Sequence, residues 1–328
     1  MSSLEIIRHA PILSAARGVG LLCDGLGRAL LHELLAHGPL TRISLAARLH
    51  AGPTRVYECL KAFAAAELIE ASTATRAPRH GITASGRALL AVATRVEAWF
   101  GRHPGGPLED SVGWRAFGDL GEAWRTALVE WIVRLGPTES DAARGLPGYA
   151  PQRLAELLSA RQEAGMVELY CARDGTLRYR LTQWAAQAIL PLAALARWED
   201  RFHPPGGASI AVEDAVVGLL AILPPVRLGS KRDALCTLTA EAGQGPTGGR
   251  RTGTVWARMR RGRVVGVGEG APPRPADGWV SGSFEAWMTA VLDGSRRALR
   301  LDGRDPAGTA TVTELLDGLH AQALDLGG

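Results

Sequence analysis

Two arginines in this sequence stand at equivalent positions and have the chemistry to bind phosphates or nucleic-acid bases. Arg153 follows Arg55 by 98 residues, and each comes two residues after a proline. A guanidinium presents a planar set of N–H donors that matches a phosphate group or the acceptor edge of guanine. Other identical residues recur at the same offset: Gly38-Pro39 and Gly136-Pro137, Glu58 and Glu156, Leu60 and Leu158, and Glu70 and Glu168. The sequence therefore contains one module twice, in tandem.

The elements that would position these arginines follow the same order in both copies. In the first copy, apolar spacing, the helix-ending Gly38-Pro39 and a capping Thr41 predict helices over 29–38, over 42–49 and from Pro53 onward. A strand then begins at Leu68, and Thr83 caps a closing helix. The second copy predicts helices over 127–135, 139–144, 151–163 and 182–202, with hairpin strands over 166–170 and 177–181. Two helices joined by a tight turn and followed by a β-hairpin form a winged helix-turn-helix.

The last third of the chain does not continue the repeat. The PPGG run at 204–207 is typical of a linker. Beyond it the sequence predicts strands over 235–241, 253–259 and 263–268, and helices over 212–223, 281–292 and 312–323. The predicted fold class is α+β, with winged helix-turn-helix domains in residues 1–110 and 111–205 and an α+β domain in residues 206–328.

Two stretches of the second copy resemble the HxlR family of bacterial winged-helix regulators, with MarR-type regulators as the nearest similar group. The stretches are LPGYAPQRLAELLSARQEAGMVEL (146–169) and RYRLTQWAAQAILPLAALARW (178–198), and GITASGRALLAVATRVEAW (81–99) has the same ending in the first copy. The resemblance covers about residues 20–202 and implies binding to double-stranded DNA. Family members normally carry one module and form homodimers. We therefore expect either a pseudo-dimer within one chain or a homodimer.

In a winged helix-turn-helix, the outward side chains at the start of the third helix read base edges, and the hairpin reaches the backbone or minor groove. The net charge of +4 is compatible with such a partner. The alternative is that these are solvated charges on faces that bind nothing, which applies more to the second copy because Glu156 and Glu163 lie on its third helix. The candidate DNA-binding residues are Thr54, Arg55, Tyr57, Lys61, Arg76 and Arg79 in the first copy, and Gln152, Arg153, Arg173 and Arg178 in the second.

The run DGWVSGSFEAWMTAVLDGSRRAL (277–299), followed by a short strand and a final helix, resembles sterol-carrier-protein-like domains. That resemblance covers about residues 208–325 and implies an apolar cavity able to hold a small apolar ligand. The alternative is that the same side chains simply fill an α+β core. The candidate ligand-binding residues are Trp256, Trp279, Phe284, Trp287 and Met288.

No motif in the sequence indicates catalysis, a metal or a cofactor. It lacks HExxH, GxSxG, a dinucleotide fingerprint and metal-spaced Cys or His, and its four cysteines form no CxxC pair. No apolar run approaches about 18 residues, so we expect no membrane partner and a cytoplasmic protein with reduced thiols. The prediction is a sequence-specific DNA-binding transcriptional regulator that senses a small apolar ligand and is not an enzyme. The alternative is an enzyme or protein-interaction scaffold built around the C-terminal cavity.

Overall fold

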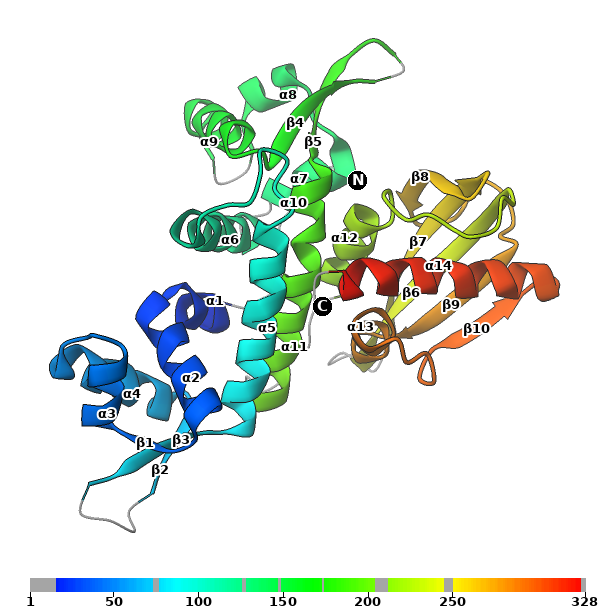
Figure 1. Cartoon of the computed structure of the whole chain (residues 1–328). Coiled ribbons are helices and arrows are strands. Elements are labelled where there is room, and N and C mark those ends of the chain that lie inside the picture. Colours follow the sequence, from blue (N-terminus) through cyan, green and yellow to red (C-terminus); the bar gives the residue numbers. More distant parts are fainter. Residues whose placement is uncertain are drawn as a thin grey trace.

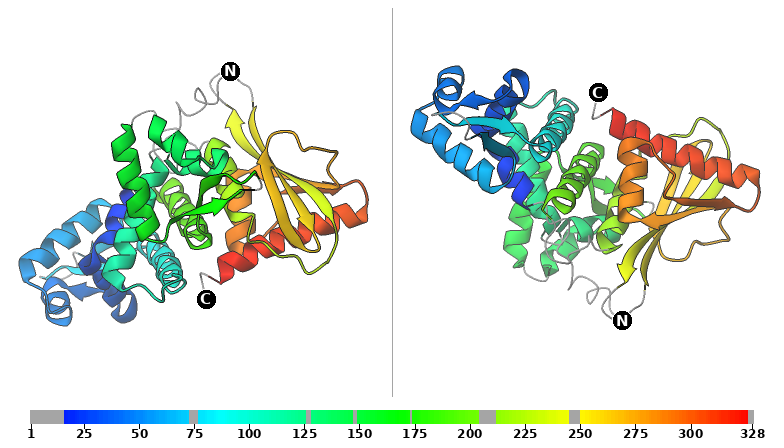
Figure 2. Two further views of the ribbon diagram at one scale, coloured as in Figure 1. Left: turned by 90° about the horizontal axis from the view of Figure 1, so that it is seen from above. Right: turned by 90° about the horizontal axis from the view of Figure 1, so that it is seen from below.

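Helices and strands both contribute to this fold, as the predicted α+β class requires. The computed structural model describes residues 16–72, 77–125, 128–146, 149–172, 174–203, 212–244 and 250–325. Two long helices lie side by side at the centre, with the two copies of the repeat around them and the C-terminal third to one side (Figure 1). In the further views, the sheet of the C-terminal third and the outer helices of the first copy lie at opposite ends of the molecule (Figure 2).

The first copy forms its helices where local signals predict them. The Thr41 hydroxyl accepts a hydrogen bond from Ser44 N, Pro53 opens the third helix, and Thr83 caps the closing helix. The helix predicted over 29–38 begins four residues earlier, at Gly25, because Asp24 caps it by accepting from Leu26 N. The elements are α1 (Ala16–Cys23), α2 (Gly25–His37), β1 (Leu40–Thr41), α3 (Arg42–Arg48), α4 (Pro53–Ala65), β2 (Ile69–Ser72), β3 (Arg79–Ile82) and α5 (Ala84–Phe100), with the strands in the order β1-β3-β2.

The second copy repeats this order, but its closing helix is divided. The prediction of one helix over 182–202 is wrong. Pro191 has no N–H to donate to the carbonyl of Gln187, and the chain closes a tighter turn in which Ala188 N donates to Ala185 O. The elements are α6 (Asp110–Arg125), α7 (Leu128–Leu135), α8 (Glu139–Arg144), α9 (Pro151–Glu163), β4 (Val167–Cys171), β5 (Leu177–Leu181), α10 (Gln183–Gln187) and α11 (Ile189–Phe202). The predicted limit between residues 110 and 111 falls in the first turn of α6.

Helices α5 and α11 join the two copies through reciprocal tryptophan contacts. Trp99 Nε1 donates to the carbonyl of Trp184 at 2.7 Å, and Trp198 Nε1 donates to the carbonyl of Ser85 at 2.9 Å. An offset of 99 residues relates Trp99 to Trp198 and Ser85 to Trp184. Exchanging the copies therefore converts one hydrogen bond into the other, as a twofold axis does in a symmetric dimer. The rings of Trp99 and Trp184 also stack, with centroids 4.2 Å apart.

The C-terminal third is a mixed sheet in the order β10-β9-β6-β7-β8, in which only the β6–β9 pair is parallel among the described strands. The predicted start of a helix at residue 281 is wrong, because the strand continues to Ser283, which then caps the helix. The last helix begins six residues before the predicted start, capped by Asp305. The elements are α12 (Val212–Ile222), β6 (Ala234–Gln244), β7 (Arg250–Arg260), β8 (Arg263–Glu269), β9 (Gly278–Ser283), α13 (Phe284–Asp293), β10 (Arg300–Gly303) and α14 (Pro306–Leu324).

Helices α12, α13 and α14 pack on one face of the sheet, and no helix of the described residues covers the other face. Val280 on the covered face is 1% exposed, whereas its neighbour Trp279 on the other face is 39% exposed. Helix α13 also contacts α11, where the Arg197 guanidinium lies 2.6 Å from Asp293 and 3.0 Å from Glu285. The sheet domain is therefore held against the central helix pair by ion pairs as well as by apolar contacts.

The reciprocal bonds predict matched losses of stability. Trp99→Phe and Trp198→Phe each remove one buried indole donor together with its hydrogen bond and part of its packing, so each should lower the free energy of unfolding by about 1–3 kcal/mol. Trp279→Phe, on the uncovered face of the sheet, should change it by less than about 0.5 kcal/mol. Urea unfolding followed by near-UV circular dichroism measures all three. Losses below 0.5 kcal/mol for both buried variants would contradict the role given to these bonds.

Candidate functional site

The outward face of α4 is polar and exposed, as its predicted role requires. Thr54, Arg55, Tyr57 and Lys61 are all exposed. The opposite side of the helix carries an apolar stripe at helical spacing that anchors it in the core of the first copy. The buried residues of the stripe are Val56, Cys59, Leu60 and Phe63. The pattern therefore fixes which side chains this helix presents to solvent.

The basic side chains of this face have no acidic partners. Among the residues that the structure describes, no carboxylate lies within 4 Å of the Arg55, Lys61 or Arg79 side chains. Arg42, at the first turn of α3, places its guanidinium 5.7 Å from the ring centre of Tyr57. Sequence reasoning missed Arg42, although its position directly after the capping Thr41 puts it at an exposed helix start. Arg76 lies outside the described residues.

The equivalent side chains of the second copy are paired with acids. Arg153 and Gln152 are exposed on α9, but Arg153 Nη1 lies 3.3 Å from Glu156 Oε2. On the hairpin, Arg178 Nη2 lies 3.1 Å from Asp174 Oδ2. Ion pairs this exposed contribute little to stability, yet each one cancels a charge. The two copies thus share a shape and differ in the positive charge that they present. Arg173 lies outside the described residues.

Asp174 keeps its negative charge to unusually low pH. The Thr176 hydroxyl donates to Asp174 Oδ1 at 2.6 Å and the Thr176 N–H donates to the same atom at 3.0 Å. These hydrogen bonds, helped by Arg178, lower the pKa of Asp174 to about 2. Arg178 therefore has a charged partner at every pH above that value.

Buried cysteines of the structure are poor nucleophiles. The Sγ of Cys59 lies 3.4 Å from the carboxylate of Asp24, and burial together with this carboxylate raises the pKa of Cys59 to about 11. Burial raises the pKa of Cys236 to about 12. Within the described ranges no group of three or more His, Cys, Asp or Glu side chains is arranged to hold a metal. No helix in those ranges is both long and apolar enough to span a membrane.

The five candidate ligand-binding residues do not lie together. Phe284, Trp287 and Met288 line an apolar gap between α11, α12 and α13, and its volume of about 30 Å³ is the space of one or two waters. Trp256 on β7 and Trp279 on β9 both pair with Thr237 of β6, which lies between them, so the two tryptophans share a face of the sheet. This face is the one opposite the helices.

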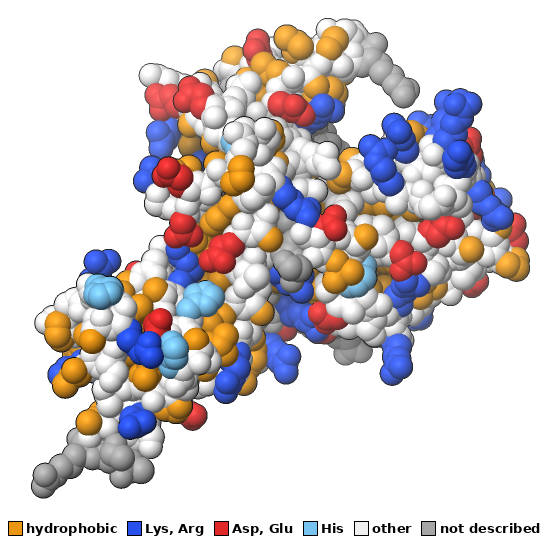
Figure 3. Space-filling model, in the orientation of Figure 1, with side chains coloured by type: hydrophobic (Ala, Val, Ile, Leu, Met, Phe, Trp, Pro, Cys, Tyr) orange, Lys and Arg blue, Asp and Glu red, His pale blue; other side chains and the backbone are white. Residues whose placement is uncertain are grey.

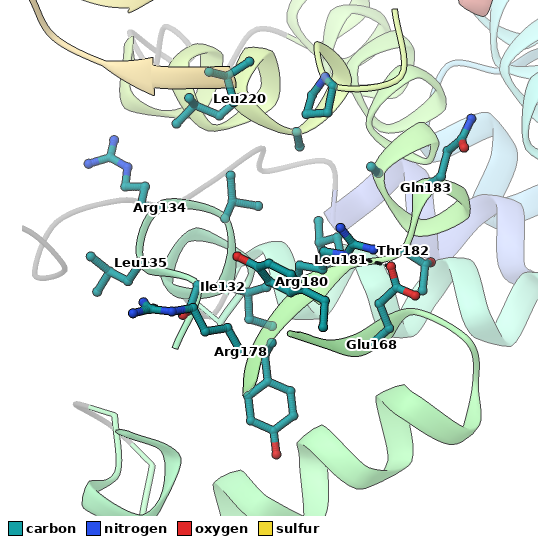
Figure 4. Close-up of a pocket in the computed structure, with 18 of the residues that line it drawn as sticks. Ile132, Arg134, Leu135, Glu168, Arg178, Arg180, Leu181, Thr182, Gln183 and Leu220 are labelled. Atoms are coloured by element: carbon teal, nitrogen blue, oxygen red, sulfur yellow. Dashed lines mark hydrogen bonds and ion pairs between the residues drawn. The ribbon is translucent and has the colours of Figure 1, made fainter. Parts of the chain in front are cut away.

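A much larger pocket lies where the second copy meets the C-terminal domain (Figure 4). This junction pocket has a volume of about 930 Å³. Its walls come from the end of α7 and the β4–β5 hairpin on one side, and from α12 and β8 on the other. No motif indicated it, because its lining residues come from both the second copy and the C-terminal domain and meet only once these two parts dock.

Comparison with known proteins adds no family to these observations. No protein-family model matches the chain, and no curated protein matches it significantly.

The hydrogen bonds to Asp174 predict a shifted titration. Thr176→Val removes the hydroxyl donor and keeps the shape, so the pKa of Asp174 should rise from about 2 toward its ordinary value of 3.8. Because the folded-state pKa is the lower one, the contribution of Asp174 to the hairpin is fully present above pH 3.8 and is lost as the pH falls through about 2. The carboxyl ¹³C shift of Asp174 followed by NMR measures the midpoint. An unchanged midpoint in Thr176→Val would assign the shift to the Thr176 N–H and Arg178 instead.

Proposed function

We propose that this chain is a sequence-specific transcriptional regulator that binds double-stranded DNA through tandem winged helix-turn-helix domains. The observation that carries the proposal is the outer face of α4, where Arg55 and Lys61 are exposed without acidic partners among the described residues. Such a face suits a helix that enters the major groove, where arginine reads guanine and lysine contacts phosphate. The exposed Arg79 of β3 would reach the backbone beside it.

The two copies would act as a pseudo-dimer within the chain. The reciprocal bonds made by Trp99 and Trp198 support this arrangement because they repeat one contact in both directions. Helices α4 and α9 both lie on the side of the central pair that faces away from the five-stranded sheet (Figure 1). The paired charges of the second copy favour a main contact through α4, with α9 as a weaker contact or a structural platform.

The C-terminal domain would be the regulatory part, of the sterol-carrier-like kind. The gap at Phe284, Trp287 and Met288 is where a small apolar ligand would enter, and at about 30 Å³ it would have to widen by side-chain movement. Because α13 is tied to α11 through Arg197, such a movement would act on the helix pair that sets the spacing of the two copies. Ligand would change DNA affinity only by its difference in affinity for the two arrangements.

Matched substitutions at the repeated arginine test the proposal. Arg55→Ala should weaken binding to the specific site by about 1–3 kcal/mol, because a base contact is lost. Arg153→Ala at the equivalent position should cost less than about 1 kcal/mol, because Glu156 already holds that side chain. Gel-shift titration on duplex DNA upstream of the gene of this protein, with a footprint to locate the site, gives both values. Equal losses of binding free energy in the two variants would contradict the distinction between the copies. An unchanged affinity of Arg55→Ala would show that Arg55 is not part of the interface.

Phosphate contacts predict steep salt dependence. The logarithm of the binding constant should fall linearly with the logarithm of salt concentration, by about 0.9 per phosphate neutralised. Lys61→Ala should reduce that slope by about 1 while weakening specific and random duplex alike. Fluorescence anisotropy between about 50 and 200 mM salt measures the slope. No binding to any duplex at low salt would replace this proposal with that of a scaffold or an enzyme built around the C-terminal domain.

A further inference from the structure

The junction pocket has the dimensions of a small-molecule site. Its volume of about 930 Å³ falls within the range of about 300–1,000 Å³ that such sites occupy. Leu220 and Ala221 of α12 and Val267 of β8 supply an apolar wall from the C-terminal domain. Across from them, the Arg180 guanidinium lies 4.6 Å from the ring centre of Tyr170, which forms a flat surface on the hairpin.

Arginines dominate the charged lining of this pocket. Four guanidiniums line it against two carboxylates, and both carboxylates are already paired, Glu168 with Arg180 at 2.8 Å and Asp174 with Arg178 at 3.1 Å. The third lining arginine, Arg227, is exposed and has no carboxylate within 4 Å in the described part of the chain. Counted over the lining residues, positive charges outnumber negative ones, and the two carboxylates near Arg134, those of Glu130 and Glu269, lie behind the lining.

Arg134 is the most unusual of these arginines. Its side chain is only 12% exposed, and its Nε lies 3.2 Å from Glu130 and 3.5 Å from Glu269. In neither contact does Nε make a hydrogen bond, and no hydrogen bond joins the rest of the guanidinium to any described residue. The terminal nitrogens of this nearly buried guanidinium therefore have N–H groups available, and an acidic group with two oxygens, such as a carboxylate, sulfonate or phosphate, can accept from two of them at once. Arg134 and Arg178 lie on the same side of the pocket (Figure 4).

The surface beside the pocket is also basic. Lys and Arg side chains gather over the edge formed by β7 and β8 (Figure 3). Arg260, Arg261 and Arg263 are exposed at the turn between these strands, and none of their three guanidiniums has a carboxylate within 4 Å among described residues, although Arg261 N donates to Asp233 Oδ1 at 2.9 Å. The field of such an edge attracts anions toward the pocket beside it.

We propose that the junction pocket binds a small organic anion with a flat aromatic body. The acidic group of the ligand binds Arg134, with Arg227 close by, and the aromatic body lies against the apolar wall and the Tyr170 surface. This site differs in place and in ligand chemistry from the apolar gap at Trp287, and it does not depend on DNA binding. Because its two walls belong to the second copy and to the C-terminal domain, the ligand holds these parts together.

Two fluorescent probes with the same ring system test the proposal on the full chain. One is the anion 8-anilinonaphthalene-1-sulfonate, and the other is the uncharged N-phenyl-1-naphthylamine. The anion should bind saturably, and Arg134→Gln should weaken it about tenfold or more through loss of a charge-assisted contact, with the uncharged probe changed less than about twofold. Arg144→Gln, which alters a 75% exposed arginine on α8 that does not line the pocket, should change neither.

Arg227→Gln is a second test that does not depend on whether Arg134→Gln folds. Arg227 is exposed and has no ion pair among described residues, so we expect its replacement to leave the fold intact. It should weaken the anion about threefold or more and leave the uncharged probe unchanged. Absence of saturable binding by the anion would overturn the proposal. So would equal loss of both probes, or an effect of Arg144→Gln as large as that of Arg227→Gln. The readout contains no DNA, so failure here leaves the proposed regulator role to its own tests.

Discussion

The pairing of α5 with α11 is the contact on which the rest of this structure depends. The indole N–H of Trp99 donates to a carbonyl in α10, the first segment of the divided closing helix, and that of Trp198 donates to a carbonyl at the start of α5. A buried indole N–H without an acceptor costs about 1–3 kcal/mol, so these bonds fix the register of the two helices as well as their contact. The C-terminal domain contacts the pair directly through α13 and α11, whereas α4 is connected to the pair through α2, and α9 through α6.

Near-symmetry of the backbone coexists with clear asymmetry of charge. The first copy leaves Arg55 and Lys61 exposed, whereas the second ties Arg153 to Glu156 and Arg178 to Asp174. The hairpin of the second copy also forms one wall of the junction pocket. This hairpin is therefore partly occupied by contacts within the molecule, whereas the hairpin of the first copy does not line this pocket.

Much of the first two thirds could be predicted because the signals are local. Helices α8 and α9 and strand β5 have the bounds predicted for them, since Thr138 caps α8 and Pro151 opens α9. The outward face of α4 followed from its apolar spacing alone. Start points were missed where a single side chain decides them: Asp24 begins α2 early and Asp305 begins α14 early.

Other features depend on tertiary packing and left no local pattern. The alternation of Trp279 and Val280 marks a strand, but the helical run from Phe284 onward obscured its last residues. Pro191 could have predicted the break in the closing helix, but the apolar residues on both sides of it have the spacing of one continuous helix. The five candidate ligand-binding residues were expected to line one apolar cavity, but Trp256 and Trp279 lie on one face of the sheet, and the other three lie on a helix that covers the opposite face. The junction pocket arises only from docking, so neither part of the sequence contains it.

Tandem placement of the copies has a consequence for mass action. An ordinary homodimer dissociates when its concentration falls below its dissociation constant, so its paired form is scarce at low abundance. Here the Trp99 and Trp198 contacts form within one chain, and the linking segment keeps the effective concentration of each partner high whatever the dilution. The paired arrangement is therefore populated to the same extent at a few copies per cell as at a few thousand. A response that depends on it scales with the first power of protein concentration rather than the second.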